Sequence, residues 1–300
     1  MTIQAAAFAN LMNPVYSKIY QDAIKEVDSV FDKYLDVLTS KQQYEKRGGM
    51  TGVGLLPVKV QGQDSAELSV YQKTSQTFTH VTYAGHIRIT KEAADDDLSG
   101  ELKKLPMYLA VGTRQTVELV CASFVDLAGT TNQADGVPLL STAHPLYGNP
   151  GATYSNTPAV PVALGVTSLE TALSAMRQNV DDYGNPQPLM PTDLMCANSN
   201  EFMTTQLFKN LDKAGTPNRD VNAIRRRGIN TIINDYLSTQ TQWHLLIPAA
   251  QRQQLFYWRE RINGQMSAAP DTTDDAIFRS RCRLSLGSID ARGWYGSMGA

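Results

Sequence analysis

The sequence predicts an α+β fold in which one long helix and a compact α/β unit carry a projecting β-hairpin. A stripe of apolar or small residues runs from Pro106 to Ala128 and stops at Gly129. Residues 50–92 are rich in Thr, Gln, Gly and Val and hold too few apolar residues to build a core. Beyond residue 164, short apolar runs alternate with helical patterns. Together these three patterns indicate mixed α+β architecture.

The composition of the 300-residue chain favours a protein that buries its surface against partners. Charged residues make up 19% of the chain, below the usual fraction of about 25%, and the formal net charge is −2. Such a balance does not indicate a dedicated nucleic-acid binder. The start of the chain lacks a signal-peptide pattern, and no apolar run approaches the ~18 residues of a membrane helix. Three widely spaced cysteines predict reduced, buried thiols: Cys121, Cys196 and Cys282.

The first element that we expect is an N-terminal helix. Asn13 and Pro14 are typical of an N-cap followed by proline at the first helical position. The helix is predicted to end near Lys46, before Gly48 and Gly49. Its apolar stripe requires a surface to lie on. The stripe consists of Val15, Ile19, Ala23, Val27, Val30, Tyr34 and Leu38.

Residues 50–92 predict a long polar hairpin that projects from the body. Alternating stretches such as 78–83 and 87–89 are typical of strands. An isolated two-stranded hairpin is at best marginally stable in water, so we expect another chain to order it. The residues expected to contact that chain are Val70, Tyr71, Phe78 and Tyr83.

The long helix beginning at Pro106 is expected to span a whole domain, since about 23 residues extend for roughly 35 Å. An α/β region follows a Gly/Pro/Asn-rich connector over 132–164. Its expected helices begin at Thr167 or Ser168 and at Ser199 or Asn200. Arginines at every second position give the last predicted strand one charged edge or face. The expected strands lie at 194–197, 231–233, 243–247, 252–261 and 276–286.

The only candidate nucleophile and base lie close together in LLSTAHPLYGN, where Ser141 precedes His144 by three residues. The serine lacks the GxSxG turn that presents a hydrolase nucleophile, and Pro145 favours an extended His144. We interpret the stretch as a turn whose hydroxyls and imidazole bond nearby backbone. A Ser/His hydrolase stays the less favoured alternative.

No cofactor or metal site is predicted. The acidic clusters at 95–97 and 271–275 lack the alternating ligands, central glycine and terminal glutamate of a calcium loop. None of the histidines forms a close ligand pair. The dense basic cluster of Arg225, Arg226 and Arg227 predicts an exposed basic loop or an ion-pair site between subunits.

Three stretches are similar to the major capsid proteins of tailed double-stranded DNA phages, the Hong Kong 97-type fold. LLSTAHPL at 139–146 resembles the "ST-x-HP" stretch that often follows their long helix, and LLIPAAQRQQLFYW resembles their late strand-loop-strand. FRSRCRLSLGSIDARGWYGSMGA is similar to their closing strand and tail, including Asp290, Gly293, Trp294 and Gly296. The order of elements extends the resemblance over nearly the whole chain.

The resemblance implies a domain plan and a structural role without catalysis. Residues 1–47 would form an N-arm, and 48–92 an E-loop hairpin reaching across a neighbouring subunit. Residues 93–134 and 269–300 would form the peripheral domain, with its spine helix and C-terminal strand, and 135–268 the axial domain. Subunits would assemble in the bacterial cytoplasm into pentamers and hexamers of an icosahedral virion shell.

The resemblance also implies partners and leaves alternatives open. Non-specific contact with packaged double-stranded DNA, a portal, possible decoration proteins and a separate scaffolding protein are expected, and a membrane is not. The retained Met1 favours separate scaffolding. An encapsulin-like compartment shell that holds enzyme cargo is the runner-up. A tail or adaptor protein would form rings instead.

Overall fold

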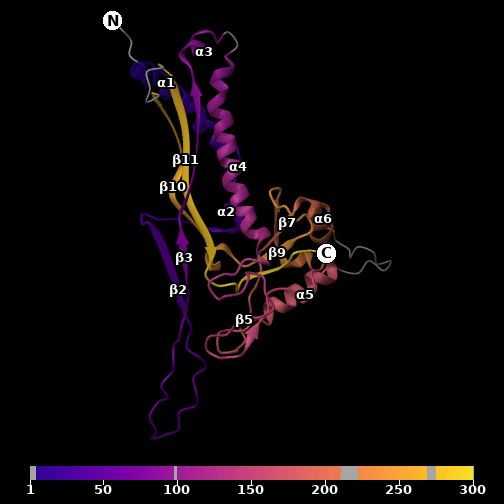
Figure 1. Ribbon diagram of the computed structural model, residues 1–300. Coiled ribbons are helices and arrows are strands. Elements are labelled where there is room, and N and C mark those ends of the chain that lie inside the picture. The colour runs from indigo at the N-terminus through magenta and orange to yellow at the C-terminus, as the bar shows by residue number, and fades with distance from the viewer. Residues whose placement is uncertain (1–4, 98–99, 211–221, 269–274, 300) are drawn as a thin grey trace.

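The computed structural model describes residues 5–97, 100–210, 222–268 and 275–299. A long helix and a long sheet lie side by side, a smaller α/β unit follows, and a hairpin projects from the base (Figure 1). The helices are α1 (Ala5–Glu26), α2 (Phe31–Tyr34), α3 (Lys91–Asp95), α4 (Leu105–Asp126), α5 (Val166–Arg177) and α6 (Glu201–Lys209). Single 3₁₀ turns are η1 (Glu101–Lys104), η2 (Asn198–Asn200), η3 (Arg225–Arg227) and η4 (Ala249–Gln251).

The strands belong to two four-stranded sheets and two short pairs among the described residues. The first sheet has the order β1-β10-β11-β4, and the second has the order β12-β9-β7-β8. The strands are β1 (Asp36–Thr39), β2 (Tyr44–Met50), β3 (Gln72–Thr79), β4 (Val81–Ile89), β5 (His144–Pro145), β6 (Thr153–Tyr154), β7 (Asp193–Ala197), β8 (Asn230–Asn234), β9 (Trp243–Leu246), β10 (Gln254–Ala268), β11 (Ala276–Ser288) and β12 (Trp294–Ser297).

The predicted long helix is confirmed as α4, with Pro106 in its first turn. Its buried face includes Val117, Cys121 and Val125, which join the main core with residues of both sheets. The capping group at its far end is Leu127, whose amide donates to the Ser123 carbonyl. This helix therefore supports both halves of the molecule.

The last long strand, β11, has the predicted charged face. Arg279 and Arg281 are exposed, while Phe278, Ser280 and Cys282 between them are buried. The buried set faces α1 and α4, because Ser280 bonds to Tyr20 on one helix and Thr113 on the other. The arginines consequently lie on the opposite face of the sheet.

The prediction of one N-terminal helix up to Lys46 is wrong. The helix α1 ends at Glu26, and the next turn of helix begins only at Phe31. The carboxylate of Glu118, on α4, accepts hydrogen bonds from the backbone amides of Val30 and Phe31 at 3.1 and 3.2 Å. This distant cap stabilises a new helix start, which a local apolar pattern does not reveal.

The predicted apolar stripe is confirmed for Ile19 and Ala23, which pack in one core cluster, but the start of α1 and the position of Val15 need correction. Helix α1 continues through Pro14 from Ala5, and Val15 is 51% exposed. Tyr16 and Tyr20 are instead buried against Met266 and Phe278. The ring of Tyr20 lies so close to Gly264 that a β-carbon there would sit 2.7 Å from it. The N-terminal helix therefore rests on the body of its own chain.

The projecting hairpin is formed by β2 and β3, which pair from Tyr44–Thr79 to Met50–Gln72. Its first limb thus starts within the predicted N-arm, and Gly48 and Gly49 lie inside a strand. The last predicted hairpin strand, β4, belongs instead to the first sheet, because it pairs with β11 along its full length. The projecting segment therefore spans residues 44–79 instead of 48–92.

Two domain boundaries differ from the prediction. Strand β10, expected in the axial domain, pairs with β11 in the first sheet, since neighbouring strands joined by a short connection pair at little entropic cost. Strand β12, expected in the peripheral domain, pairs with β9 in the second sheet. The predicted strands β7, β8 and β9 are confirmed, and α5 and α6 pack against this sheet.

Candidate functional site

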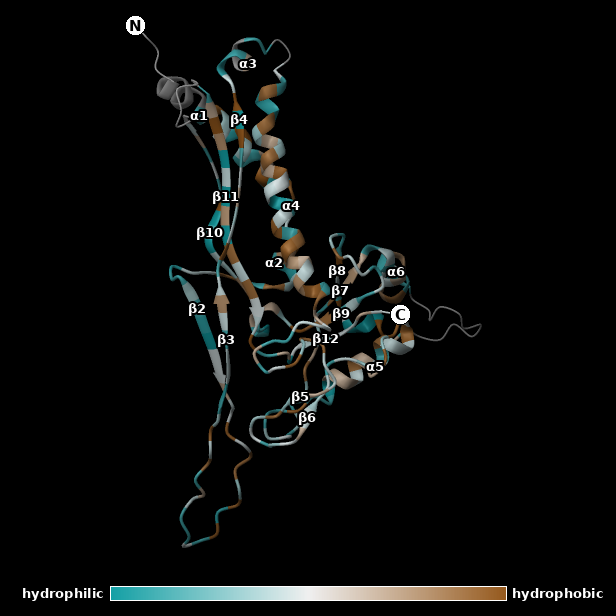
Figure 2. Cartoon of the chain, viewed as in Figure 1, coloured by the Kyte–Doolittle hydropathy of each residue, from teal (hydrophilic) through white to brown (hydrophobic). Residues whose placement is uncertain are grey.

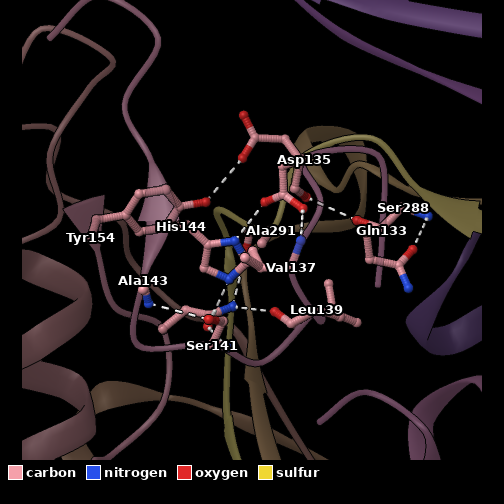
Figure 3. A network of polar contacts seen from close by, with 12 residues as sticks. Gln133, Asp135, Val137, Leu139, Ser141, Ala143, His144, Tyr154, Ser288 and Ala291 are labelled. Carbon is pink, nitrogen blue, oxygen red and sulfur yellow. Dashed lines mark hydrogen bonds and ion pairs between the residues drawn. The ribbon is translucent and has the colours of Figure 1, made fainter. Parts of the chain in front are cut away.

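The connector at 139–146 is a hydrogen-bonded turn at the junction of the two units. His144 is fully buried, and its Nδ1 lies 2.7 Å from Oδ2 of Asp135. Its ring stacks on Tyr154, with centroids 4.9 Å apart. Figure 3 shows the imidazole between these two side chains. The ring therefore fixes the turn to the strand pair β5–β6.

Asn156 completes this connector, although no pattern in the sequence pointed to it. Its Oδ1 accepts from the Ser141 amide at 2.9 Å and lies 3.2 Å from His144 Nε2. Its Nδ2 donates to the carbonyls of Leu139 and Trp294 at 2.7 and 2.9 Å. One buried amide thus joins the "ST-x-HP" stretch to the C-terminal tail, two segments that the sequence resemblance had singled out separately.

The same geometry excludes Ser141 as a nucleophile activated by His144. The Ser141 hydroxyl accepts from the Ala143 amide at 3.2 Å, as is usual in serine turns (Figure 3). Both ring nitrogens of His144 face Asp135 and Asn156 instead of this hydroxyl. The predicted turn is confirmed for the hydroxyl, whereas the imidazole bonds side chains rather than backbone.

A second buried histidine, His244, lies beneath the tail. Its Nδ1 accepts from the Trp294 indole at 3.1 Å, and its Nε2 donates to Oε1 of Gln242 at 3.3 Å. Complete burial lowers the pKa of His244 to about 3. The ring is therefore neutral at physiological pH and serves packing in the second sheet.

Four charged side chains hold the base of the hairpin against the α/β unit. Lys73, on β3, contacts Asp182 at 2.9 Å and Asp290 at 2.8 Å. Arg292 contacts the same two carboxylates at 2.9 and 3.1 Å. Burial alone would raise the pKa of Asp290, but the charges of Arg292 and Lys73 outweigh it and hold this pKa at about 2. Alternating charges thus fix the hairpin's direction.

Hydrogen bonds of three tyrosine hydroxyl groups add to this attachment. The Tyr183 hydroxyl donates to the Ser69 carbonyl, and the hydroxyl of Thr74 lies 2.7 Å from that of Tyr147. On the other side of the base, Arg47 Nε donates to the Tyr257 hydroxyl at 2.9 Å. The hairpin base is therefore attached to both units of the same chain.

Beyond this base the hairpin tip, residues 51–69, carries exposed apolar side chains on its outgoing limb. Leu55, Leu56 and Val58 are 76%, 80% and 94% exposed. Figure 2 shows these hydrophobic stretches on a loop that stands away from the rest of the molecule. Clustered exposed apolar side chains of this kind mark interaction surfaces.

The residues predicted to contact another chain lie in different environments. Val70 and Tyr71 are 50% and 48% exposed beside the hairpin base, where the Tyr71 amide donates to the Thr51 hydroxyl. Phe78 is buried, with its ring 5.1 Å from that of Tyr257, so it has no surface to offer and that prediction is wrong for this side chain. Tyr83 is half-buried against the main core.

The arginine cluster stays a predicted contact site. Arg225, Arg226 and Arg227 form η3, and all three are exposed on the α/β unit. The turn ends at Gly228, whose φ of +63° suits glycine. The structure gives this loop the exposure that the sequence predicted.

Other candidate chemistry is weak in the described part of the chain. No group of three metal-ligating side chains occurs there, and no described helix is long and apolar enough to cross a membrane. Burial raises the pKa of Cys196 to about 12 and that of Cys282 to about 11, which makes both thiols unreactive. The Asp97 carboxylate accepts hydrogen bonds from the backbone amides of Gly100 and Leu102, as expected for an acidic residue before a helix. Residues 271–274 of the other acidic cluster lie outside the described residues.

Comparison with known proteins gives a family match and several structural matches. The model of the family described as "Phage capsid protein" matches residues 73–297, most of the chain. A search of curated proteins found no match.

Among solved structures, the chain resembles the capsid of bacteriophage JBD30 decorated with minor capsid protein trimers, with a TM-score of 0.54 and 14% identity over 73% of this chain and 94% of that one. It is also similar to structures of Mycobacterium phage Bobi (TM-score 0.55, 10% identity, 90% and 89% covered) and Microbacterium phage Oxtober96 (TM-score 0.54, 10% identity, 90% of each chain covered). At these identities the similarity shows a shared fold.

Proposed function

Because the chain belongs to the phage capsid protein family and is a structural, non-enzymatic subunit of a phage head, we propose that it forms a Hong Kong 97-type shell of pentamers and hexamers around double-stranded DNA. The observation that carries this proposal is the hairpin, whose base is fixed by Lys73 and whose tip exposes Leu56 and Val58. A rigid projection with an apolar end provides the repeated heterologous contact that closed rings require.

The domain plan follows the two sheets. We assign the N-arm to α1 and the residues up to β1, and the E-loop to the β2–β3 hairpin. The peripheral domain comprises α4 with the sheet β1-β10-β11-β4, and the axial domain comprises the sheet β12-β9-β7-β8 with α5 and α6. The connector held by Asn156 joins the two domains.

The inter-subunit contacts follow from this plan. Val70 and Tyr71 support a contact of the hairpin with a neighbouring subunit, because both stay half-exposed on the hairpin. Arg225, Arg226 and Arg227 support an ion-pair contact between axial domains, since they are exposed on that domain. Tyr83, half-buried in the core, supports such a contact only through its exposed part.

The remaining partners are proposed from the family membership. A separate scaffolding protein, a portal and packaged DNA complete the particle, which assembles in the bacterial cytoplasm. Decoration proteins are included because the JBD30 capsid is described as carrying minor capsid protein trimers. Contact with DNA is non-specific, in keeping with a net charge of −2.

Expression of the full chain, alone and with the scaffolding protein of its phage, tests the proposal. Negative-stain imaging and sedimentation should reveal closed shells, or capsomers that become shells when scaffold is present. A persistent monomer, or open rings in both conditions, would contradict it.

The contents of the particles separate the phage head from an encapsulin-like compartment, which the family match does not favour. Particles from infected or induced cells should hold nuclease-protected DNA. Particles that hold an enzyme and no nucleic acid would support the compartment instead.

A further inference from the structure

The sheet of the peripheral domain ends in an uncovered strand. Strand β4 is the last strand of the order β1-β10-β11-β4, so one side of its backbone has no partner strand in the described chain. Thr113 of α4 bonds to Ser280 on the neighbouring strand β11, which places the helix over β11 rather than over the edge. Val81 and Gly85, on the face of β4 that turns toward the helix, are consequently exposed.

A groove of about 380 Å³ runs between this edge strand and α4. Its walls are uncharged and include two glycines. A β-carbon on Gly112 would meet no atom within 4 Å, and one on Gly85 would meet only Leu109, at 4.0 Å. The groove thus has room for additional side chains. Lining residues include Thr82, Tyr83 and Gly85 from β4, and Leu109, Gly112 and Thr116 from α4.

The exposed side of α4 also lacks charge. Tyr108 and Leu119 are each 55% exposed, and Gly112 and Gln115 between them are exposed too. The charged residues at the lower end of the helix turn inward: Glu118 caps α2, and Asp126 accepts from Ser238 and Gln242. Solvated helix faces normally carry charged residues, so a face of this kind indicates a surface that another chain covers.

The hairpin contains a segment suited to this groove. Residues 51–60 run as an extended trace outside any strand and hold a single charged residue, Lys59. The returning limb is less suitable, because it carries Asp64 and Glu67 toward an uncharged groove. Pro57 is compatible with an added strand, since that strand would become the new edge and needs hydrogen bonds on one side only.

We propose that residues 53–60 of one subunit add as a strand to the free edge of β4 in a neighbouring subunit, with Leu56 and Val58 in the groove between β4 and α4. This inference rests on the proposed shell function. Side chains alternate along a strand, so Leu56 and Val58 share one face while Lys59 points to the other. Figure 1 shows the hairpin tip and the upper part of α4 at opposite ends of the molecule, so a chain does not fill its own groove.

Two kinds of contact contribute to this binding: backbone hydrogen bonds and apolar side-chain packing. Backbone hydrogen bonds along β4 provide affinity without demanding particular side chains, as in other strand-addition complexes. The two apolar side chains set the register, because a slip by one residue would bring Lys59 into the uncharged groove. The hairpin therefore contributes a strand, and the neighbour contributes an edge and a pocket.

Cysteine crosslinking tests the contact in assembled shells. Chains carrying Val58→Cys are co-expressed with chains carrying Gly112→Cys, and the shells are oxidised. The native thiols Cys121, Cys196 and Cys282 are buried, which keeps the background low. Disulfide-linked dimers are expected for this pair. They are not expected when Gly112→Cys is replaced by Val160→Cys, an exposed position on the α/β unit. Intact shells without the Val58–Gly112 link would overturn the proposal.

A groove-filling substitution provides an independent test. Gly112→Leu adds a side chain into open space and raises helix propensity, so the subunit should fold. Closed shells should be lost while folded subunits or capsomers accumulate. The matched control is Thr171→Leu, at an exposed position of helix α5 on the α/β unit, and it should assemble normally. Normal shells from Gly112→Leu would contradict the inference. A failure of the unsubstituted chain to form shells would instead contradict the shell function itself.

Discussion

The connector around Asn156 and the tip of the hairpin differ in how far their side chains are buried and partnered within one chain. In the connector, a buried amide and a buried imidazole find all their partners within one chain. At the tip, Leu55, Leu56 and Val58 remain 76–94% exposed. The difference separates residues that fix the shape of one subunit from residues that, in the proposed shell, a second subunit covers. Substitutions in the first region should change the free energy of unfolding, and those in the second should change assembly.

The largest effect on stability is expected from Asn156→Ala. The substitution leaves the Ser141 amide and two buried carbonyls without their partner, and each such group costs about 1–3 kcal/mol. The free energy of unfolding should fall by about 3 kcal/mol or more, measured by urea denaturation of unassembled subunits. Asn149→Ala, at an exposed position in the following turn, is the control and should be near neutral. A small effect at Asn156 would show that the connector is not a structural node.

Acid should weaken the subunit through His244. The folded-state pKa of about 3 lies below the ordinary value, so between these pH values only the unfolded chain binds the proton. Stability is therefore complete above about pH 6.5 and is lost as the pH falls toward 3. At pH 5 the loss should reach about 2 kcal/mol.

The free energy of unfolding, measured from pH 7 to 5, checks this slope. In His244→Gln the slope due to this residue should disappear. Asp290 contributes at lower pH, since its depressed pKa of about 2 means that its contribution is lost only as the pH falls from about 4 toward 2. An unchanged slope in His244→Gln would assign the acid sensitivity to other groups.

A smaller loss is expected from Lys73→Met at the hairpin base. The change leaves Asp182 and Asp290 to share Arg292, and because Arg292 remains, the cost should be about 1.5 kcal/mol, the low end for a hydrogen bond to a charged group. Hydrogen exchange should increase in β2 and β3, because the hairpin loses its charged attachment. Lys59→Met, at an exposed position of the tip, provides a charge-matched control. Equal protection from hydrogen exchange in both variants would mean that the tyrosine hydrogen bonds alone hold the hairpin.

The smallest effect on the subunit is expected from Leu56→Ser at the tip. An 80% exposed side chain contributes little to folding, so the free energy of unfolding should change by less than about 0.5 kcal/mol. Shell yield, counted by electron microscopy, should nevertheless fall. A stable variant that still assembles fully would remove the tip from the inter-subunit contact.

Local patterns were sufficient where one element has one dominant periodicity. The stripe from Pro106 predicted α4, and alternating arginines predicted the exposed face of β11. The turn at Ser141 followed from the chemistry of serine and proline. In each case the determining interactions lie within a few residues of the chain.

Other features depended on distant partners. The helix break after Glu26 is stabilised by Glu118, and the burial of Phe78 depends on Tyr257. Asn156 has no local signature, because its partners belong to the connector and the C-terminal tail.

By itself, the sequence determined the mixed fold class, the long helix, the polar hairpin and a low content of charged residues that suits an assembling protein. Only the tertiary structure decided that β10 belongs to the first sheet and β12 to the second. It also decided that α1 packs on its own chain and that an open groove lies beside β4. The physical reason is that periodicity reports which face of an element is buried. Which element covers that face is decided by hydrogen bonds and packing between residues far apart in the chain.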